Sequence, residues 1–134
     1  AGSIKSPIFR GGGRVFGPKP RNYGFKLNKK LKALARKSAL AYKAKDKNLM
    51  ILEDFSFETP KTKDFANVLS SLSISDKKTL FVVSKEEKNV VISARNLQNT
   101  KVITADTLST YDVLNADSLL ISESSVEKIE NLLK

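Results

Sequence analysis

The sequence predicts an α/β domain of three layers, α/β/α, with a mostly parallel four-stranded sheet, preceded by an extended basic arm rich in glycine and proline. Four short apolar runs separated by helical segments support this fold class. Each run is apolar on both faces, as buried parallel strands are. The runs lie at residues 49–52, 79–84, 101–105 and 118–122. Helices that alternate with such strands usually cover both faces of one sheet.

The first helix is expected over residues 27–45, with Asn28 as its N-cap. Helical spacing puts one set of residues on a single face, which we expect to pack on the sheet: Leu27, Leu31, Leu34, Ala35, Ser38 and Tyr42. The globular domain should therefore span residues 26–134, with the arm in residues 1–25.

Four further helices are expected between and after the strands. The helix after the first strand should begin with Thr59 as N-cap and Pro60 at the first helical position. Its inward face would carry Phe65, Val68, Leu69 and Leu72, and a short helix should follow at residues 89–97. Ser109 with Asp112, and Ser124 with Glu127, have the spacing of capping boxes and should open the last two helices.

The arm holds all six glycines and three of the four prolines of the chain, and it has no acidic residue. Glycine raises the entropic cost of ordering and proline removes amide donors, so we expect the arm to become ordered through contacts with a partner, not with itself. The phosphates of a polyanion would bind the basic side chains of the arm, and the aromatic rings of the arm would pack on exposed bases. The basic residues are Lys5, Arg10, Arg14, Lys19 and Arg21, and the aromatic ones are Phe9, Phe16 and Tyr23.

Charge is distributed unevenly along the chain. Residues 1–47 contain 14 lysines and arginines and a single acid, whereas residues 48–134 contain 10 bases and 13 acids. A basic stripe on the first helix lacks acidic partners at i+4, so its members repel one another. A solvated face is the alternative interpretation, but the asymmetry favours contact with RNA or DNA. The residues concerned are Lys26, Lys29, Lys30, Lys32, Arg36, Lys37 and Lys43.

Composition excludes several classes of function. The chain has no cysteine and no histidine, so disulfides, thiol nucleophiles and the usual general base are absent. We therefore expect no enzyme activity, cofactor or metal. No apolar run approaches the ~20 residues of a membrane span. The sequence predicts a cytosolic protein without a membrane partner.

Two motifs allow other interpretations. The run Gly11–Gly17 could cradle a phosphate or form a flexible connector, but it neither follows a strand nor opens a helix, as nucleotide-binding loops do. Glu53 and Asp54 follow the first strand, at the edge where open α/β sheets bind ligands, and could hold Mg²⁺ or act as acid and base in a nucleotide-dependent enzyme. A solvated loop is the simpler interpretation of both acids.

Three basic residues of the later part of the chain are also candidates for RNA contact. Lys61 and Lys63 fall in the first turn of a predicted helix, where the helix dipole disfavours cations. Such a local conflict at the surface indicates an anionic contact. Arg95, near the end of the third predicted helix, is a weaker candidate of the same kind.

Four motifs in order resemble the bacterial large-subunit ribosomal protein L-four family over essentially the whole chain. They are Ser3–Pro7, the run from Gly12-Gly13 to Phe16–Arg21, Pro60–Lys63 and Ser93–Leu97. The sequence is similar to the later two-thirds of such a protein. It begins without methionine, in what we expect to be a loop, which indicates a fragment of a longer polypeptide.

The resemblance implies a structural constituent of the large ribosomal subunit. It implies primary binding of large-subunit ribosomal RNA, a part in subunit assembly, support of the peptide exit tunnel region and contact with neighbouring ribosomal proteins. Residues 1–25 would match the returning limb of a long loop threaded through RNA. Some family members also repress their own operon through the leader mRNA, which leaves a regulatory RNA-binding module as an alternative.

Overall fold

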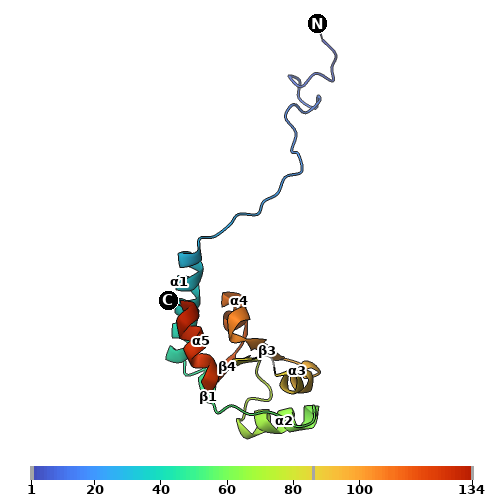
Figure 1. Cartoon of the computed structure of the whole chain (residues 1–134). Coiled ribbons are helices and arrows are strands. Elements are labelled where there is room, and N and C mark those ends of the chain that lie inside the picture. Colours follow the sequence, from blue (N-terminus) through green and yellow to red (C-terminus); the bar gives the residue numbers. More distant parts are fainter. Residues whose placement is uncertain (1, 86, 134) are drawn as a thin grey trace.

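The computed structural model describes residues 2–85 and 87–133 and has a four-stranded sheet with helices on both faces (Figure 1). All the strand pairings are parallel, and the strand order is β1-β4-β2-β3. The strands are β1 (Leu49–Leu52), β2 (Thr79–Val83), β3 (Thr100–Thr104) and β4 (Ser118–Ser122). The predicted α/β class with a parallel four-stranded sheet is confirmed.

The last strand in sequence lies in the middle of the sheet. β4 pairs with β1 from Leu49↔Leu119 onward and with β2 from Thr79↔Ser118 onward. Every residue of β2 and β4 is buried, but β1 and β3 are edge strands and only half-buried, with Ile51 58% exposed. Burial on both faces was predicted for all four strands, and it holds only for the two that have neighbours on both sides.

One face of the sheet is covered by α1 (Lys29–Lys45), α4 (Thr110–Asn115) and α5 (Glu123–Leu133), together with the 3-10 turn η1 (Ala105–Thr107). Leu80 and Val82 of β2 and Leu119 and Ile121 of β4 point to this face. Successive side chains of a strand point to opposite faces of the sheet, so the residues between these four point to the other face. The sheet therefore separates two cores.

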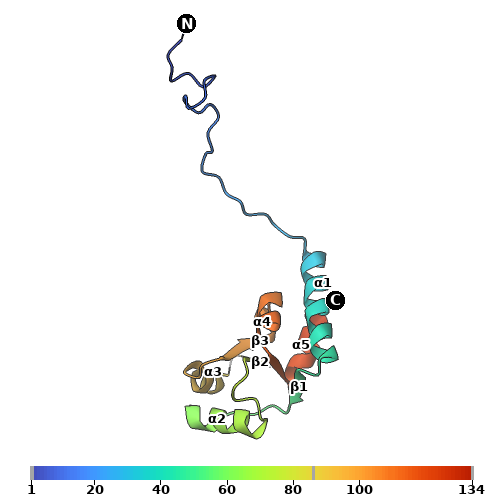
Figure 2. The same cartoon turned by 180° about the vertical axis from the view of Figure 1, so that it is seen from behind.

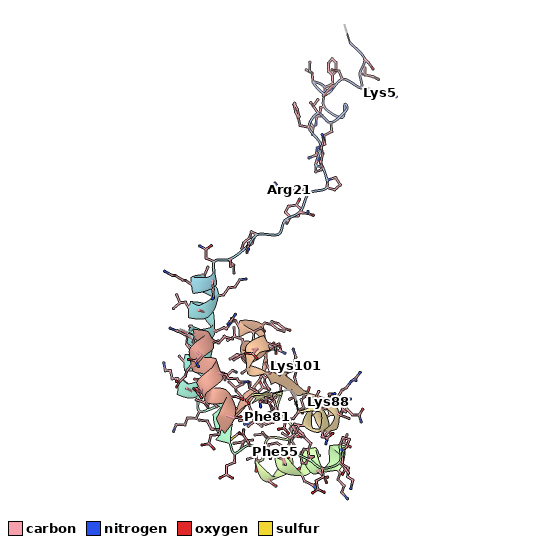
Figure 3. The ribbon with its side chains drawn as sticks, viewed as in Figure 1. Lys5, Arg21, Phe55, Phe81, Lys88 and Lys101 are labelled. Carbon is pink, nitrogen blue, oxygen red and sulfur yellow. The ribbon has the colours of Figure 1, made fainter. Side chains whose placement is uncertain are left out.

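The other face is covered by α2 (Thr62–Ser71) and α3 (Lys88–Arg95). Phe81 and Leu120 enter this second core and meet Phe65 of α2. Phe55, in the loop after β1, stacks on Phe81 with ring centroids 5.4 Å apart and an angle of 9° between the rings (Figure 3). This ring contact fixes the loop that leads from β1 to α2.

Two predicted helix starts are wrong, and one is confirmed. α2 begins at Thr62 with Lys61 as its N-cap, not at Pro60 after Thr59. α5 follows β4 without a loop, so Ser124 lies in its first turn and is not the N-cap. Ser109 does cap α4, because its hydroxyl accepts a hydrogen bond from the Asp112 N–H at 3.1 Å.

The face of α1 that packs on the domain also differs from the prediction. Ala39 is the buried residue of α1, and Leu40 packs beside it. The predicted inward face is exposed instead, at Leu27, Leu31, Leu34, Ala35, Ser38 and Tyr42. The small side chain of Ala39 permits close approach to the core formed by α4 and α5, whereas Leu27 and Leu31 line an open hollow beside residues 106–110.

Residues 2–28 contain no helix or strand, and both views show this segment leading away from the domain (Figures 1 and 2). Asn28 occupies the N-cap position of α1, although its side chain makes no capping hydrogen bond. Among the described residues, no helix has both the length and the apolar composition to cross a membrane.

Asp112 joins α4 to the edge strand β3. Its carboxylate accepts hydrogen bonds from Lys101 Nζ at 2.6 Å and from the Ser109 hydroxyl at 2.7 Å. Burial acts to raise the pKa of Asp112, but the two hydrogen bonds and the charge of Lys101 outweigh it, so this pKa lies below its ordinary value of 3.8. The charged carboxylate therefore stabilises the fold.

We predict that Asp112→Asn lowers the free energy of unfolding at pH 7 by about 1 kcal/mol. The expected loss is small because Lys101 is largely exposed, and solvent weakens its ion pair with Asp112. The lowered pKa means that this contribution is present above pH 3.8 and is lost as the pH falls below it. Urea unfolding of both proteins at pH 7 and at a pH below the folded-state pKa measures the difference.

The difference between the two proteins should shrink in acid, and a difference that stays constant would contradict the assignment. Asp106→Asn is the matched control, because Asp106 is exposed in η1. It should change the unfolding free energy by less than about 0.5 kcal/mol at either pH.

Candidate nucleic-acid interface

The predicted basic stripe of α1 runs along the side of the helix that approaches the domain. Lys29 and Lys32 are exposed and Arg36 is half-buried. Lys43 is turned inward, and its ammonium group donates a hydrogen bond to the Ala116 carbonyl at 2.5 Å. The C-terminal end of the stripe thus anchors the helix, while its N-terminal half keeps its cations at the surface.

Two hollows flank this N-terminal half. One, of about 570 Å³, is lined by Lys29, Lys30, Lys32, Ala33 and Arg36 of α1 and by Asn131 and Leu132 of α5. The other, of about 440 Å³, lies between the first turns of α1 and the segment 106–110. Lys32 and Arg36 line both hollows, so cations border two concave surfaces at the base of the arm. Lys26 and Lys37 are exposed nearby in the sequence.

The distal part of the arm is not the open chain that composition predicts. Residues 3–13 form a closed loop held by backbone hydrogen bonds, the last of them from the Gly13 N–H to the Lys5 carbonyl at 2.7 Å. The expectation that the arm makes no ordering contacts with itself is therefore wrong for these residues. Lys5 and Arg10 are both exposed on this loop, and Figure 3 shows Lys5 near the far end of the arm.

The proximal part, residues 14–27, makes no backbone–backbone hydrogen bond among the described residues. Arg14, Lys19 and Arg21 are exposed along it, and the Arg21 guanidinium lies 4.7 Å from the centroid of the Tyr23 ring. Such a cation–π contact holds a planar cation and an aromatic ring side by side. Both groups remain accessible, because the Tyr23 ring is 77% exposed.

Phe16 combines two unusual features. Its side chain is 100% exposed, and its φ of 52° lies in the left-handed region, which bulky residues rarely adopt. No part of the described chain buries the ring or compensates the backbone conformation. Phe9, the third predicted aromatic, is 54% exposed in the loop of residues 3–13.

The three later basic candidates lie elsewhere on the domain. Lys61 is the N-cap of α2, Lys63 lies in its first turn, and Arg95 ends α3, where a cation interacts favourably with the helix dipole. Both views place α2 at the end of the domain opposite the arm (Figures 1 and 2). The fold therefore does not bring these residues together with the arm and α1.

The carboxyl edge of the sheet has a hollow of about 310 Å³, and Asp54, which lines it, is bound to the start of α5. The Asp54 carboxylate accepts hydrogen bonds from the Ser124 hydroxyl at 2.9 Å and from the Ser124 N–H at 3.4 Å, at the start of α5. A carboxylate at a helix N-terminus is a structural cap. Within the described chain, no group of three or more acidic side chains is placed to hold a metal ion. The geometry does not favour a nucleotide-dependent enzyme.

Two features of the surface were missed by reasoning from sequence. The leucines of α1 have helical spacing, which predicts that they face inward, but they are exposed. The residue of α1 that packs inward is the small Ala39. The closed loop of the arm was also missed. Its successive turns join Ser3, Ser6, Phe9 and Gly12 through backbone hydrogen bonds, and these side chains share no property that would predict the turns.

Comparison with known proteins gives a consistent result. The model of the ribosomal protein L4/L1 family matches residues 1–132. The large ribosomal subunit protein uL4 of Christiangramia forsetii is 62% identical over 133 residues, which cover 99% of this chain and 64% of the relative. The protein of the same name from Cytophaga hutchinsonii is 56% identical over the same shares, and that of Amoebophilus asiaticus is 60% identical over 96% of this chain and 61% of its own.

The chain spans less than two-thirds of the length of these curated relatives. Within that span the match includes both the arm and the α/β domain, since the family model begins at residue 1. The protein belongs to the ribosomal protein L4/L1 family.

Proposed function

We propose that the chain is a structural, non-enzymatic constituent of the large ribosomal subunit that binds ribosomal RNA through its arm and the N-terminal half of α1. The observation that carries the proposal is the basic segment of residues 1–47, which has 14 cations and one acid and lies almost wholly at the surface. Closely spaced phosphates would neutralise it. The names of the curated relatives, large ribosomal subunit protein uL4, support the same role.

The arm supplies the contacts that need no sequence-specific readout. Arg10, Arg14 and Arg21 have guanidinium groups that bind phosphate bidentately or stack on bases. Phe16, exposed and in an unfavourable backbone conformation, is suited to pack on an unpaired base or ribose. Specificity in this mode comes mainly from the shape of the folded RNA.

The domain anchors the arm at one side of the subunit. α1 carries the arm, and Lys32 and Arg36 extend the basic surface from the arm onto concave parts of the domain. Lys61, Lys63 and Arg95 would make a separate contact at the opposite end. The proposed role covers assembly of the subunit, support of the exit tunnel region, contact with neighbouring ribosomal proteins and a place in the cytoplasmic ribosome.

We predict that replacing Arg10, Arg14 and Arg21 together by glutamine weakens binding to a large-subunit ribosomal RNA fragment. The slope of log affinity against log salt concentration should fall by about 2–3, because up to three phosphate contacts are lost. The melting temperature of the domain should stay the same, since all three side chains are exposed outside it. Filter binding across a salt series and thermal unfolding measure the two effects.

Wild-type binding that does not change with salt would contradict the proposed function. Triple replacement of Lys77, Lys85 and Lys88 by glutamine is a charge-matched control outside the proposed interface. All three residues are exposed, and none of them forms an ion pair among the described residues. The control should leave the salt slope close to that of the wild type.

A second prediction compares the two ends of the domain. Lys32→Gln with Arg36→Gln should reduce the salt slope by about 2 for a short RNA fragment that binds the arm. Lys61→Gln with Lys63→Gln removes the same charge from the opposite end and should have the smaller effect on that fragment. If the α2 pair causes the larger loss, α1 is not part of the main interface.

A further inference from the structure

The edge strand β3 has outer backbone groups without a strand partner. The Asn99 carbonyl, just before β3, accepts a hydrogen bond from the first N–H of β2 at 2.8 Å. The backbone groups of successive residues in a strand point to alternate sides, so those of Thr100, Val102 and Thr104 point away from β2. Among the described residues, only one of these groups is bonded, the Thr104 carbonyl, which accepts from the Thr107 hydroxyl at 3.0 Å.

The usual protections of an edge strand are missing from β3. Natural edge strands avoid unwanted pairing through proline, a β-bulge or a charged side chain that stands across the edge. β3 has no proline, and its register with β2 runs without interruption from Thr100 to Thr104. Its single charged residue, Lys101, is drawn back onto α4, where its ammonium group lies 2.6 Å from the Asp112 carboxylate. The edge is therefore open to another strand.

Two hollows lie at opposite ends of β3. The hollow at the amino end, of about 230 Å³, includes the cations of Lys78 and Lys101 together with Asp112. Asp112 already pairs with Lys101, so the charge of Lys78 has no ion pair within the described chain. The hollow at the carboxyl end measures about 240 Å³ and is lined mainly by apolar side chains: Val83, Val91, Val102, Ile103, Thr104 and Thr107.

We propose that the edge of β3 binds an extended segment of another protein, which adds a fifth strand to the sheet. Backbone hydrogen bonds to Thr100 and Val102 hold the segment in place. One of its apolar side chains enters the hollow beside Val91, and an acidic side chain lies near Lys78. Strand addition takes its affinity from main-chain hydrogen bonds and its specificity from pockets for alternate side chains. This interface is separate from the RNA-binding surface of α1 and does not rest on it.

An acidic polypeptide segment fits this edge better than RNA or a second copy of the chain does. Donors and acceptors at strand spacing match a polypeptide backbone, and the hollow at the carboxyl end has no cation among its lining residues. A second copy would offer its own Thr100–Thr104, which contains a lysine and no acid. α3, which packs on β3, adds Lys88 and Arg95 and no acid. Charge complementarity therefore selects an acidic partner.

The probe is a short synthetic peptide of alternating valine and threonine with two glutamates at one end. Added to the 134-residue chain, it should shift the backbone amide signals of Thr100, Val102 and Thr104 in NMR spectra. Methylation of alternate peptide nitrogens removes the donors that face β3 and should abolish binding. Lysines in place of the two glutamates should weaken binding about tenfold.

Two proline variants locate the site on the protein. Val102→Pro removes an outward N–H without removing a bond to β2 and should bind the peptide about tenfold more weakly. Ile51→Pro is the matched control at the other edge of the sheet. The Asn48 carbonyl bonds to the Leu119 N–H of β4, so the N–H of Ile51 also points outward. This control should bind the peptide as the wild type does, and circular dichroism checks that both variants fold.

If Val102→Pro does not fold, the methylated peptide decides the question with the wild-type protein. Absence of peptide binding, equal binding of the methylated peptide, or equal losses in the two proline variants would each overturn the proposal. If a ribosomal RNA fragment displaces the peptide and shifts the same β3 amides, the edge belongs to RNA. If the free chain self-associates in sedimentation and Val102→Pro abolishes this, the occupant is a second copy. Either result also contradicts the proposal.

Discussion

The insertion of β4 between β1 and β2 is the constraint on which the domain depends. Among the described strands, β1 pairs with β4 alone, so the first and last thirds of the domain are joined through residues 118–122. Both central strands are wholly buried, and their side chains alternate between the two cores. Parallel strands of this kind bring together residues far apart in sequence, and such non-local pairing slows folding.

Closure of the sheet also determines where α1 lies and what it exposes. The helix packs against α4 and α5, and it is held by buried Ala39, by Leu40 beside it and by the hydrogen bond from Lys43 to the Ala116 carbonyl. These three residues lie in its C-terminal half, and its first turn is exposed. Its N-terminal cations therefore border open hollows, and the arm starts from a helix whose position is set by the core.

Acidic and basic groups serve different purposes in this molecule. Asp54 and Asp112 stabilise the starts of α5 and α4, so these acids are bound to the protein's own donors. The cations of residues 1–37 have no ion pair within 4 Å among the described residues. These two acids are thus bound within the domain, whereas the positive charge of residues 1–37 remains for an external polyanion. The same division explains why the carboxyl edge of the sheet, where α/β enzymes bind ligands, carries a helix cap here.

By itself the sequence determined the fold class, the strand positions to within a residue and the basic character of the first 47 residues, because apolar patterning and charge are local properties. Ser109 was found as a cap for the same reason. Only the tertiary structure decided which face of α1 packs inward, because Ala39 reaches the core whereas Leu31 borders an open hollow beside residues 106–110. The tertiary structure also placed Lys61 away from the arm. It closed the loop at Gly12, where an added Cβ would lie 1.9 Å from the Ser6 carbonyl oxygen, and composition gives no sign of such a backbone contact.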